Sequence, residues 1–237
     1  MRITKHSHRH AEAILRNVPE YLPLWEEIQN MLAAITEEKL IQHFQENFEG
    51  KEEQTKSLSK TVNALVYEGL RAKTPKELKG QDDSSVWIAE SQIFGESEYG
   101  LNEWRLDFAR KVKITDLAVL DASKQIDSGI SIEVAFNNAG SAAWNLIKPV
   151  IASELNHVKK NIQTSIGIVI AATEGFKKAG GFDSTVGTFE TYTKMLVPMR
   201  DLISVPMLII GLEAPETFRI AQERKNGKLY GRIELLT

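Results

Sequence analysis

The chain has 237 residues, of which 42% are hydrophobic and 26% charged, and a formal net charge of −3. This composition is ordinary for a soluble globular protein and gives no global sign of a nucleic-acid partner, while the lack of cysteine excludes disulfides and thiolate metal sites. The first residues, MRITKHSHRH, lack a signal-peptide core, and no apolar run approaches the roughly 20 residues of a membrane span, so we expect a cytoplasmic protein.

The N-terminal third of the chain is typical of packing helices. Apolar residues recur at helical spacing over residues 11–17, 24–35, 37–48 and 58–72. Glu68 lies beside the apolar stripe of the last of these helices. It is interpreted either as a surface glutamate or as an acid that the helix presents to a metal site.

Two alternating runs, residues 113–120 and 130–136, predict paired strands joined by a polar hairpin loop. Each run carries one carboxylate, Asp116 in the first and Glu133 in the second. Side chains alternate along a strand, so Glu133 shares a face with Ala135. If the strands pair, the two acids converge and repel each other unless a cation compensates, and Mg²⁺ is the natural compensator.

The remaining elements predict an α/β fold. A helix over residues 142–160 is followed by a buried strand at 164–172, a helix at about 185–203 and a second buried strand at 205–212. This order predicts a mixed central sheet with helices on its faces. Residues 218–237 predict a hairpin, so we expect a single domain over the whole chain with this hairpin as an appendage.

Four segments, taken in order, carry a resemblance to a known family: LWEEIQ near the N-terminus, SIEVAFNN at residues 131–138, IGIVIAATEG after it and VPMLIIGLE at residues 205–213. Together they resemble type II restriction endonucleases of the BglII and BstYI group and, more distantly, BamHI. The wider superfamily has an active-site pattern of Asp, a gap, then Glu-x-Lys. The resemblance implies a restriction-endonuclease-like sheet flanked by helices.

By this resemblance, Asp116 matches the first metal-binding aspartate and Glu133 the second acidic ligand, with the Val134 carbonyl as a further ligand for Mg²⁺. Asp121 competes for the first role, because the spacing from Asp116 to Glu133 is wider than in BglII. Ala135 departs from the family pattern. Its position holds Lys in the wider superfamily, Gln in BglII and BstYI and Glu in BamHI, where it positions or activates the attacking water. Alanine can do neither.

Three explanations for Ala135 stay open: Glu68 or Asp121 substitutes for the missing group, the natural protein is weak or inactive, or the residue was mutated on purpose.

The activity that the resemblance implies is Mg²⁺-dependent hydrolysis of double-stranded DNA at a short palindrome, with a GATC centre as the leading expectation. One alternative is a sequence-specific DNA-binding protein that keeps the fold without cleaving. Another is a scaffold in which Asp116 and Glu133 form surface ion pairs.

Two polar loops are expected to contact DNA. Amide and hydroxyl groups suit base edges, and we expect such contacts around Asn137, Asn138, Ser141, Phe182, Asp183, Ser184 and Thr185. The alternative is that the asparagines and the following glycine only make a turn. Lys148 is expected to meet a phosphate, which positions the duplex without reading it. The resemblance further implies a homodimer with helix 142–160 at its two-fold interface, so that matching half-sites are met.

Overall fold

The computed structural model describes residues 1–51, 55–79, 84–95, 104–115, 124–136, 138–154 and 158–236. Its centre is a mixed six-stranded sheet with the order β1-β6-β5-β4-β3-β2, in which β4, β5 and β6 run parallel and the other pairings are antiparallel. The strands are β1 (Ile3–His8), β2 (Ile88–Gln92), β3 (Arg105–Thr115), β4 (Gln125–Ala135), β5 (Ile166–Ala172) and β6 (Met207–Leu212).

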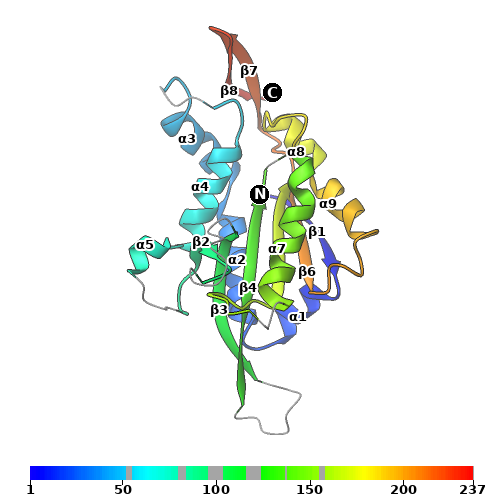
Figure 1. The fold of residues 1–237 in the computed structure, drawn as a ribbon. Coiled ribbons are helices and arrows are strands. Elements are labelled where there is room, and N and C mark those ends of the chain that lie inside the picture. Colours follow the sequence, from blue (N-terminus) through cyan, green and yellow to red (C-terminus); the bar gives the residue numbers. More distant parts are fainter. Residues whose placement is uncertain are drawn as a thin grey trace.

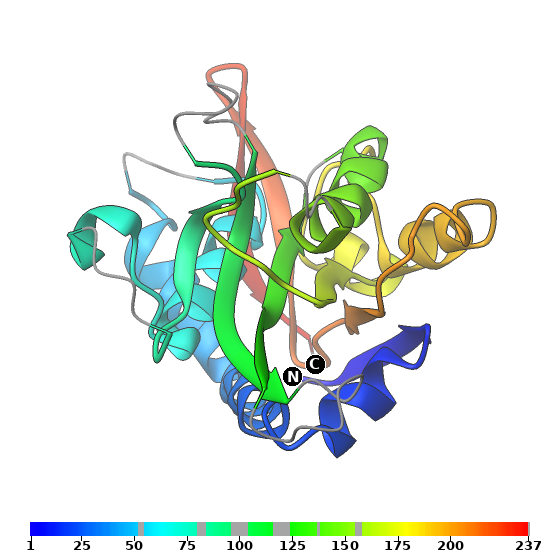
Figure 2. The same ribbon diagram turned by 60° about the horizontal axis from the view of Figure 1, so that its bottom comes forward.

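Helices cover both faces of this sheet (Figures 1 and 2). One side carries α1 (Ala11–Asn17), α2 (Leu22–Ala34), α3 (Glu37–Asn47) and α4 (Ser59–Leu70). The other side carries α7 (Ala142–Glu154) and α9 (Phe189–Leu196), and the short elements are α5 (Pro75–Leu78), η1 (Ala139–Ser141) and α8 (Glu174–Ala179). The predicted mixed sheet with helices on its faces is therefore confirmed.

Each face of the sheet has its own core. Ile130, Ile132 and Val134 of β4 pack with the helices of the first side, whereas Ala135 belongs to the cluster formed with α7 and α9. Every residue of β5 and β6 is buried, as predicted for central strands covered on both faces. The alternation along β4 therefore directs Glu133 and Ala135 towards α7.

The hairpin of β3 and β4 differs from the predicted one. β3 begins at Arg105, eight residues earlier than expected, and β4 begins at Gln125. The register pairs Phe108 with Ile132 and ends with Thr115 opposite Gln125. Charged residues at positions 110, 111 and 113 hide the period of two in the long first strand, which is why the apolar alternation alone placed its start too late.

Two helices are shorter than predicted. α9 ends at Leu196 instead of residue 203, because Pro198 has no backbone N–H to donate to the carbonyl of Lys194. α7 ends at Glu154, and Lys160, the expected last residue of this helix, pairs with Phe94 in an isolated antiparallel bridge. The helices predicted over residues 11–17, 24–35, 37–48 and 58–72 are confirmed within two residues at each end.

The predicted C-terminal hairpin is present as β7 (Phe218–Lys225) and β8 (Lys228–Leu235), a separate two-stranded sheet that projects from one end of the molecule (Figure 1). Its turn, Asn226 and Gly227, has φ values of 49° and 77°, the left-handed backbone that tight hairpin turns require. No helix in the described ranges has the length and apolar character needed to cross a bilayer.

Candidate active site

Asp107 and Glu133 form a pair of acids across two neighbouring strands. Phe108 of β3 is paired with Ile132 of β4, and the two strands are antiparallel. The residue before Phe108, Asp107, therefore lies opposite the residue after Ile132, Glu133. Residues directly opposite in an antiparallel pair have Cβ atoms about 4.5–5.5 Å apart. Asp107 Oδ2 also accepts a hydrogen bond of 2.8 Å from the backbone amide of Val134. The carboxylate of Asp107 is therefore fixed beside Glu133.

Glu133 is buried between the sheet and α7, and only 1% of its surface is exposed to solvent. Its Oε2 atom forms an ion pair with the Nζ atom of Lys148, which α7 brings to the sheet. Its Oε1 atom has no hydrogen-bond partner among the described residues. Lys148 Nζ also donates to the carbonyl oxygen of Arg105 at 3.0 Å. Burying a carboxylate oxygen without a hydrogen-bond partner costs free energy, which indicates that this oxygen binds a ligand.

Electrostatics disfavour two charged carboxylates at this place. Burial raises the pKa of Glu133 to about 8, and repulsion from Asp107 raises it as well, although the ammonium of Lys148 opposes both effects. Burial also raises the pKa of Asp107, against the attraction of Lys148. The pair therefore favours binding either a proton or a further cation.

Glu90 flanks Asp107 on the side away from Glu133. It lies on β2 between Ala89 and Ser91, which pair with Phe108 and Leu106 of β3. Its backbone has a φ of 49°, and its exposed side chain forms an ion pair with Arg105 at 3.2 Å. The charge of Glu90 contributes to the raised pKa of Asp107. A third carboxylate therefore stands at the solvent side of the pair.

The donor set suits a hard divalent cation, which takes oxygen ligands. Asp107 and Glu133 supply carboxylates, and the unpartnered Glu133 Oε1 is available to a metal. The backbone amide of Val134 donates to Asp107 on β3. Because the amide and the carbonyl of one strand residue point to the same neighbouring strand, the Val134 carbonyl also points towards β3. In the described part of the chain, no three His, Cys, Asp or Glu side chains come close enough to hold a metal, so water or phosphate would complete the coordination.

A close contact sets the position of α7 over the sheet. A Cβ atom added to Gly167 of β5 would lie 2.8 Å from Cβ of Pro149, so this glycine lets α7 approach β5 closely. One turn earlier in α7, Asn145 donates a hydrogen bond of 2.8 Å to the hydroxyl of Tyr192 on α9. Lys148 stands next to Pro149 and is therefore held over Glu133 by contacts on both sides.

Comparison with known proteins decides the family. A family model described as restriction endonuclease BglII/BglIII matches residues 3–212. The chain belongs to this family. The crystal structure of restriction endonuclease BglII complexed with a DNA 16-mer has a TM-score of 0.57 and 14% identity over 100% of both chains. Free BglII gives a TM-score of 0.45 and 15% identity over 100% of both chains. No match was found among the curated proteins.

The family assignment confirms the resemblance found in the sequence, and the likeness to DNA-bound BglII confirms the restriction-endonuclease-like fold. In this BglII/BglIII-family chain the predicted acid Glu133 is at the buried site, and Ala135 lies on the same face with 1% exposure. Asp116 and Asp121 lie outside the described residues. The structure thus provides a partner acid, Asp107, that the sequence prediction did not include.

The position of Thr115 bears on the choice between the aspartates. Thr115 precedes Asp116 and pairs with Gln125, which is eight residues before Glu133 on β4. A strand rises about 3.3 Å per residue, so this end of the hairpin lies roughly 26 Å from Glu133. The sequence signal for Asp107 was its place between Leu106 and Phe108, two apolar residues that are buried in the structure. It was missed because the strand was predicted to begin at residue 113.

Lys148 lies in other surroundings than expected, whereas Glu68 fits one of its two interpretations. Lys148, expected to meet a DNA phosphate, is 9% exposed and contacts Glu133. Glu68 is exposed on α4, a helix of the opposite side of the sheet from the one that Glu133 faces, which fits its interpretation as a surface glutamate.

The two predicted DNA-contacting loops come together at the C-terminal ends of β4 and β5. The amide of Ala139 donates to the Thr185 carbonyl at 2.6 Å, and Asn138 forms a β-bridge with Val186. Asp183, Ser184 and Thr185 are exposed. The structure therefore joins these loops into one polar edge.

Individual residues of this edge differ in what they can contact. The Asn138 side chain accepts a hydrogen bond of 2.8 Å from the Gly140 amide, the turn-making contact considered as the alternative, although the residue is exposed. Phe182 is 9% exposed and packs on Phe136 with ring centroids 5.1 Å apart, so it belongs to the core. Ser141 is half-buried, and Asn137 lies outside the described residues.

Asp183 has partners within this edge. Lys56 forms an ion pair with its carboxylate at 2.7 Å, and the amide and hydroxyl of Thr185 donate to its other oxygen. These contacts hold the pKa of Asp183 well below its usual range, so this side chain is a charged acceptor at neutral pH.

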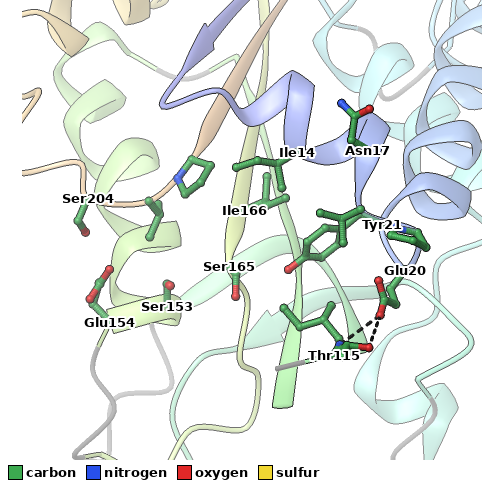
Figure 3. Close-up of a pocket in the computed structure, with 15 residues that line it drawn as sticks. Ile14, Asn17, Glu20, Tyr21, Thr115, Ser153, Glu154, Ser165, Ile166 and Ser204 are labelled. Carbon is green, nitrogen blue, oxygen red and sulfur yellow. Dashed lines mark hydrogen bonds between the residues drawn. The ribbon is translucent and has the colours of Figure 1, made fainter. Parts of the chain in front are cut away.

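A cavity of about 640 Å³ lies elsewhere, near the N-terminal ends of β5 and β6 (Figure 3). The carboxylate of Glu20 in its wall accepts hydrogen bonds from the amide and hydroxyl of Thr115 at 3.1 and 3.2 Å. The Tyr21 hydroxyl lies 2.5 Å from Ser128 Oγ, which in turn lies 2.6 Å from Ser165 Oγ. These polar groups satisfy one another, so we assign no chemistry to this cavity.

Proposed function

We propose that this chain is a Mg²⁺-dependent type II restriction endonuclease that hydrolyses phosphodiesters of double-stranded DNA at a short palindrome. The observation that carries the proposal is the pair of half-buried Asp107 and buried Glu133, with Glu133 Oε1 unpartnered among the described residues, on a restriction-endonuclease fold. That the BglII structure of similar fold is complexed with DNA supports the choice of substrate.

Asp107 takes the metal-binding role that the sequence analysis gave to Asp116. Its support is the register that sets it opposite Glu133 and the hydrogen bond from the Val134 amide. The Val134 carbonyl is the third protein ligand. Bound Mg²⁺ supplies charge stabilisation at the scissile phosphate and lowers the pKa of a bound water. The packing of α7 on the sheet keeps bulk water away from Glu133, which strengthens its interaction with a cation.

Base recognition is proposed for the polar edge formed by residues 138–141 and 183–185, and the GATC-centred palindrome remains the leading site. Two matching half-sites imply a homodimer. Support for α7 at the two-fold interface is the ring of Trp144, which is 51% exposed on this helix and lies 4.6 Å from the Trp104 ring. Exposed aromatic residues of this kind are enriched at protein interfaces.

The test is cleavage of mixed-sequence duplex DNA by wild type, D107N, E133Q and D116N, with Mg²⁺ or Ca²⁺. We expect discrete fragments from wild type with Mg²⁺, a loss of at least about 10²-fold in D107N and E133Q because a ligand is gone, and little change in D116N. Asp127→Asn, an exposed carboxylate on β4, is the matched control. Loss in D116N with activity kept in D107N would return the first role to Asp116.

A non-cleaving sequence-specific DNA-binding protein is the second candidate function. It is favoured by Ala135, whose buried methyl group offers no hydrogen bond to an attacking water. Retention of one DNA sequence with Ca²⁺, together with no fragments in Mg²⁺, would support this function over the nuclease. A protein that neither retains nor cuts DNA would fit neither.

A further inference from the structure

We infer that Lys148 of α7 supplies the polar contact to the attacking water that the family obtains from the side chain two residues after Glu133. This inference rests on the proposed nuclease function. In this chain Ala135 leaves that position without a functional group, while the ammonium of Lys148 reaches the same carboxylate from the neighbouring helix. The group has moved from the strand to the helix that covers it.

The packing around Ala135 explains how a helix residue can take this place. Ala135 shares its face of β4 with Glu133, and its methyl group packs in one cluster with Ala142 and Leu146 of α7. Small side chains at positions 135 and 142 let α7 lie close to the sheet. Lys148 stands farther along this helix and extends its side chain to Glu133.

The contacts of Lys148 leave it able to bind a further acceptor. An ammonium group has three donors, and in the described part of the chain two acceptors are found, Glu133 Oε2 and the Arg105 carbonyl at 3.0 Å. Arg105 is two residues before Asp107, so the ammonium lies between the segments that carry the two acids. The third donor is available to a water or phosphate oxygen between them.

A purely structural counter-ion is the competing interpretation. A buried ion pair gives little net stability, because desolvation of both charges offsets their attraction, and its removal leaves an uncompensated charge. A structural lysine would therefore affect folding when replaced, but moving the ammonium to position 135 would restore no chemistry. The two interpretations differ in what a relocated lysine does.

The experiment compares wild type, K148A, the relocation variant A135K/K148A, and K194A as control, since Lys194 is exposed on the neighbouring helix α9. Cleavage is measured with Mg²⁺, the affinity for Ca²⁺ alone by calorimetry, and DNA retention with Ca²⁺ by fluorescence anisotropy. Thermal unfolding shows which variants fold. The relocation keeps the number of lysines and approximately the side-chain volume at the site.

We expect K148A to lose about 10²-fold in cleavage, because the attacking water is no longer held in position by the ammonium. Its Ca²⁺ affinity should stay equal or increase, because a positive charge beside Glu133 has been removed. A135K/K148A should recover at least tenfold over K148A, and K194A should match wild type. Equal cleavage by K148A and K194A, or no recovery in the folded relocation variant, overturns the inference. A wild type that neither binds Ca²⁺ nor cuts DNA would instead overturn the proposed nuclease.

Discussion

At the residue scale, Glu133 connects the chemistry of the site to the stability of the fold. Its folded-state pKa of about 8 exceeds its ordinary value of 4.5, mainly because of burial. Between these two values the folded chain holds the proton more tightly than the unfolded chain does. The contribution of Glu133 to stability is therefore full below about pH 4.5 and is lost as the pH rises towards 8.

The direction of this pH dependence gives a prediction for the stability of the metal-free protein. The melting temperature of wild type relative to E133Q should fall as the pH rises from 5 to 9, because only wild type must bury a new charge. Ca²⁺ should raise the melting temperature of wild type at pH 8 and leave that of E133Q nearly unchanged. Scanning calorimetry in EDTA and in Ca²⁺ measures both effects. Parallel pH curves for wild type and E133Q would contradict the raised pKa, and D127N serves as the matched control.

At the scale of elements, the contact between α7 and β5 places the lysine. Gly167 has no Cβ, so Pro149 can lie directly against the strand, and Lys148 next to it reaches Glu133. Helix and strand are thereby fixed to each other at the site. Protein interiors are close-packed, so a single added methyl group at this contact must displace a neighbour.

We therefore expect Gly167→Ala to displace α7. The new Cβ would lie 2.8 Å from Cβ of Pro149, which overpacks the contact and costs about 1–3 kcal/mol of stability. Cleavage should fall further than the loss of folded protein explains, because Lys148 moves with the helix. Urea unfolding and cleavage rates per folded protein measure the two effects.

Gly175→Ala is the matched control for this change. Gly175 lies in α8, where the nearest atom to an added Cβ is Ala214 Cβ at 3.5 Å, an ordinary contact. Alanine in a helix is favoured over glycine by up to about 1 kcal/mol, so this variant should be equally or more stable. An equally small effect at both positions would argue that the Gly167 contact does not set the position of α7.

At the scale of the whole molecule, the homodimer expected from the family remains a prediction. The exposed Trp144 ring on α7, which is part of the same helix as Lys148, would place the interface next to the active site. In such an arrangement each protomer would present one site to one strand of a palindrome. Assembly and double-strand cleavage would then depend on the same helix.

Trp144→Glu tests this arrangement. A charge at the centre of a two-fold interface meets its own copy, so the variant should sediment as a monomer at concentrations where wild type is a dimer. Leu235→Glu, on the hairpin strand β8, changes a residue that is 68% exposed and should leave the mass unchanged. Analytical ultracentrifugation provides the readout. A W144E variant that sediments as wild type does would exclude α7 as the interface.

The sequence alone determined the features that depend on short-range pattern. The buried runs that became β5 and β6, the helices of the first side and the face of β4 that carries Glu133 follow from hydrophobic period and alternation. The family also follows from ordered local segments. In each case the physical signal lies within one element, where a residue's neighbours along the chain fix which way its side chain points.

Only the tertiary structure decided which residues meet Glu133. Asp107 is 26 positions before it, and its partnership depends on the register of a long hairpin whose charged residues hide the period. Lys148 comes from a helix, and its position depends on how closely Pro149 approaches Gly167. Strand register and helix packing are set by contacts between distant segments, and these contacts leave no periodic trace in the sequence around the residues they bring together.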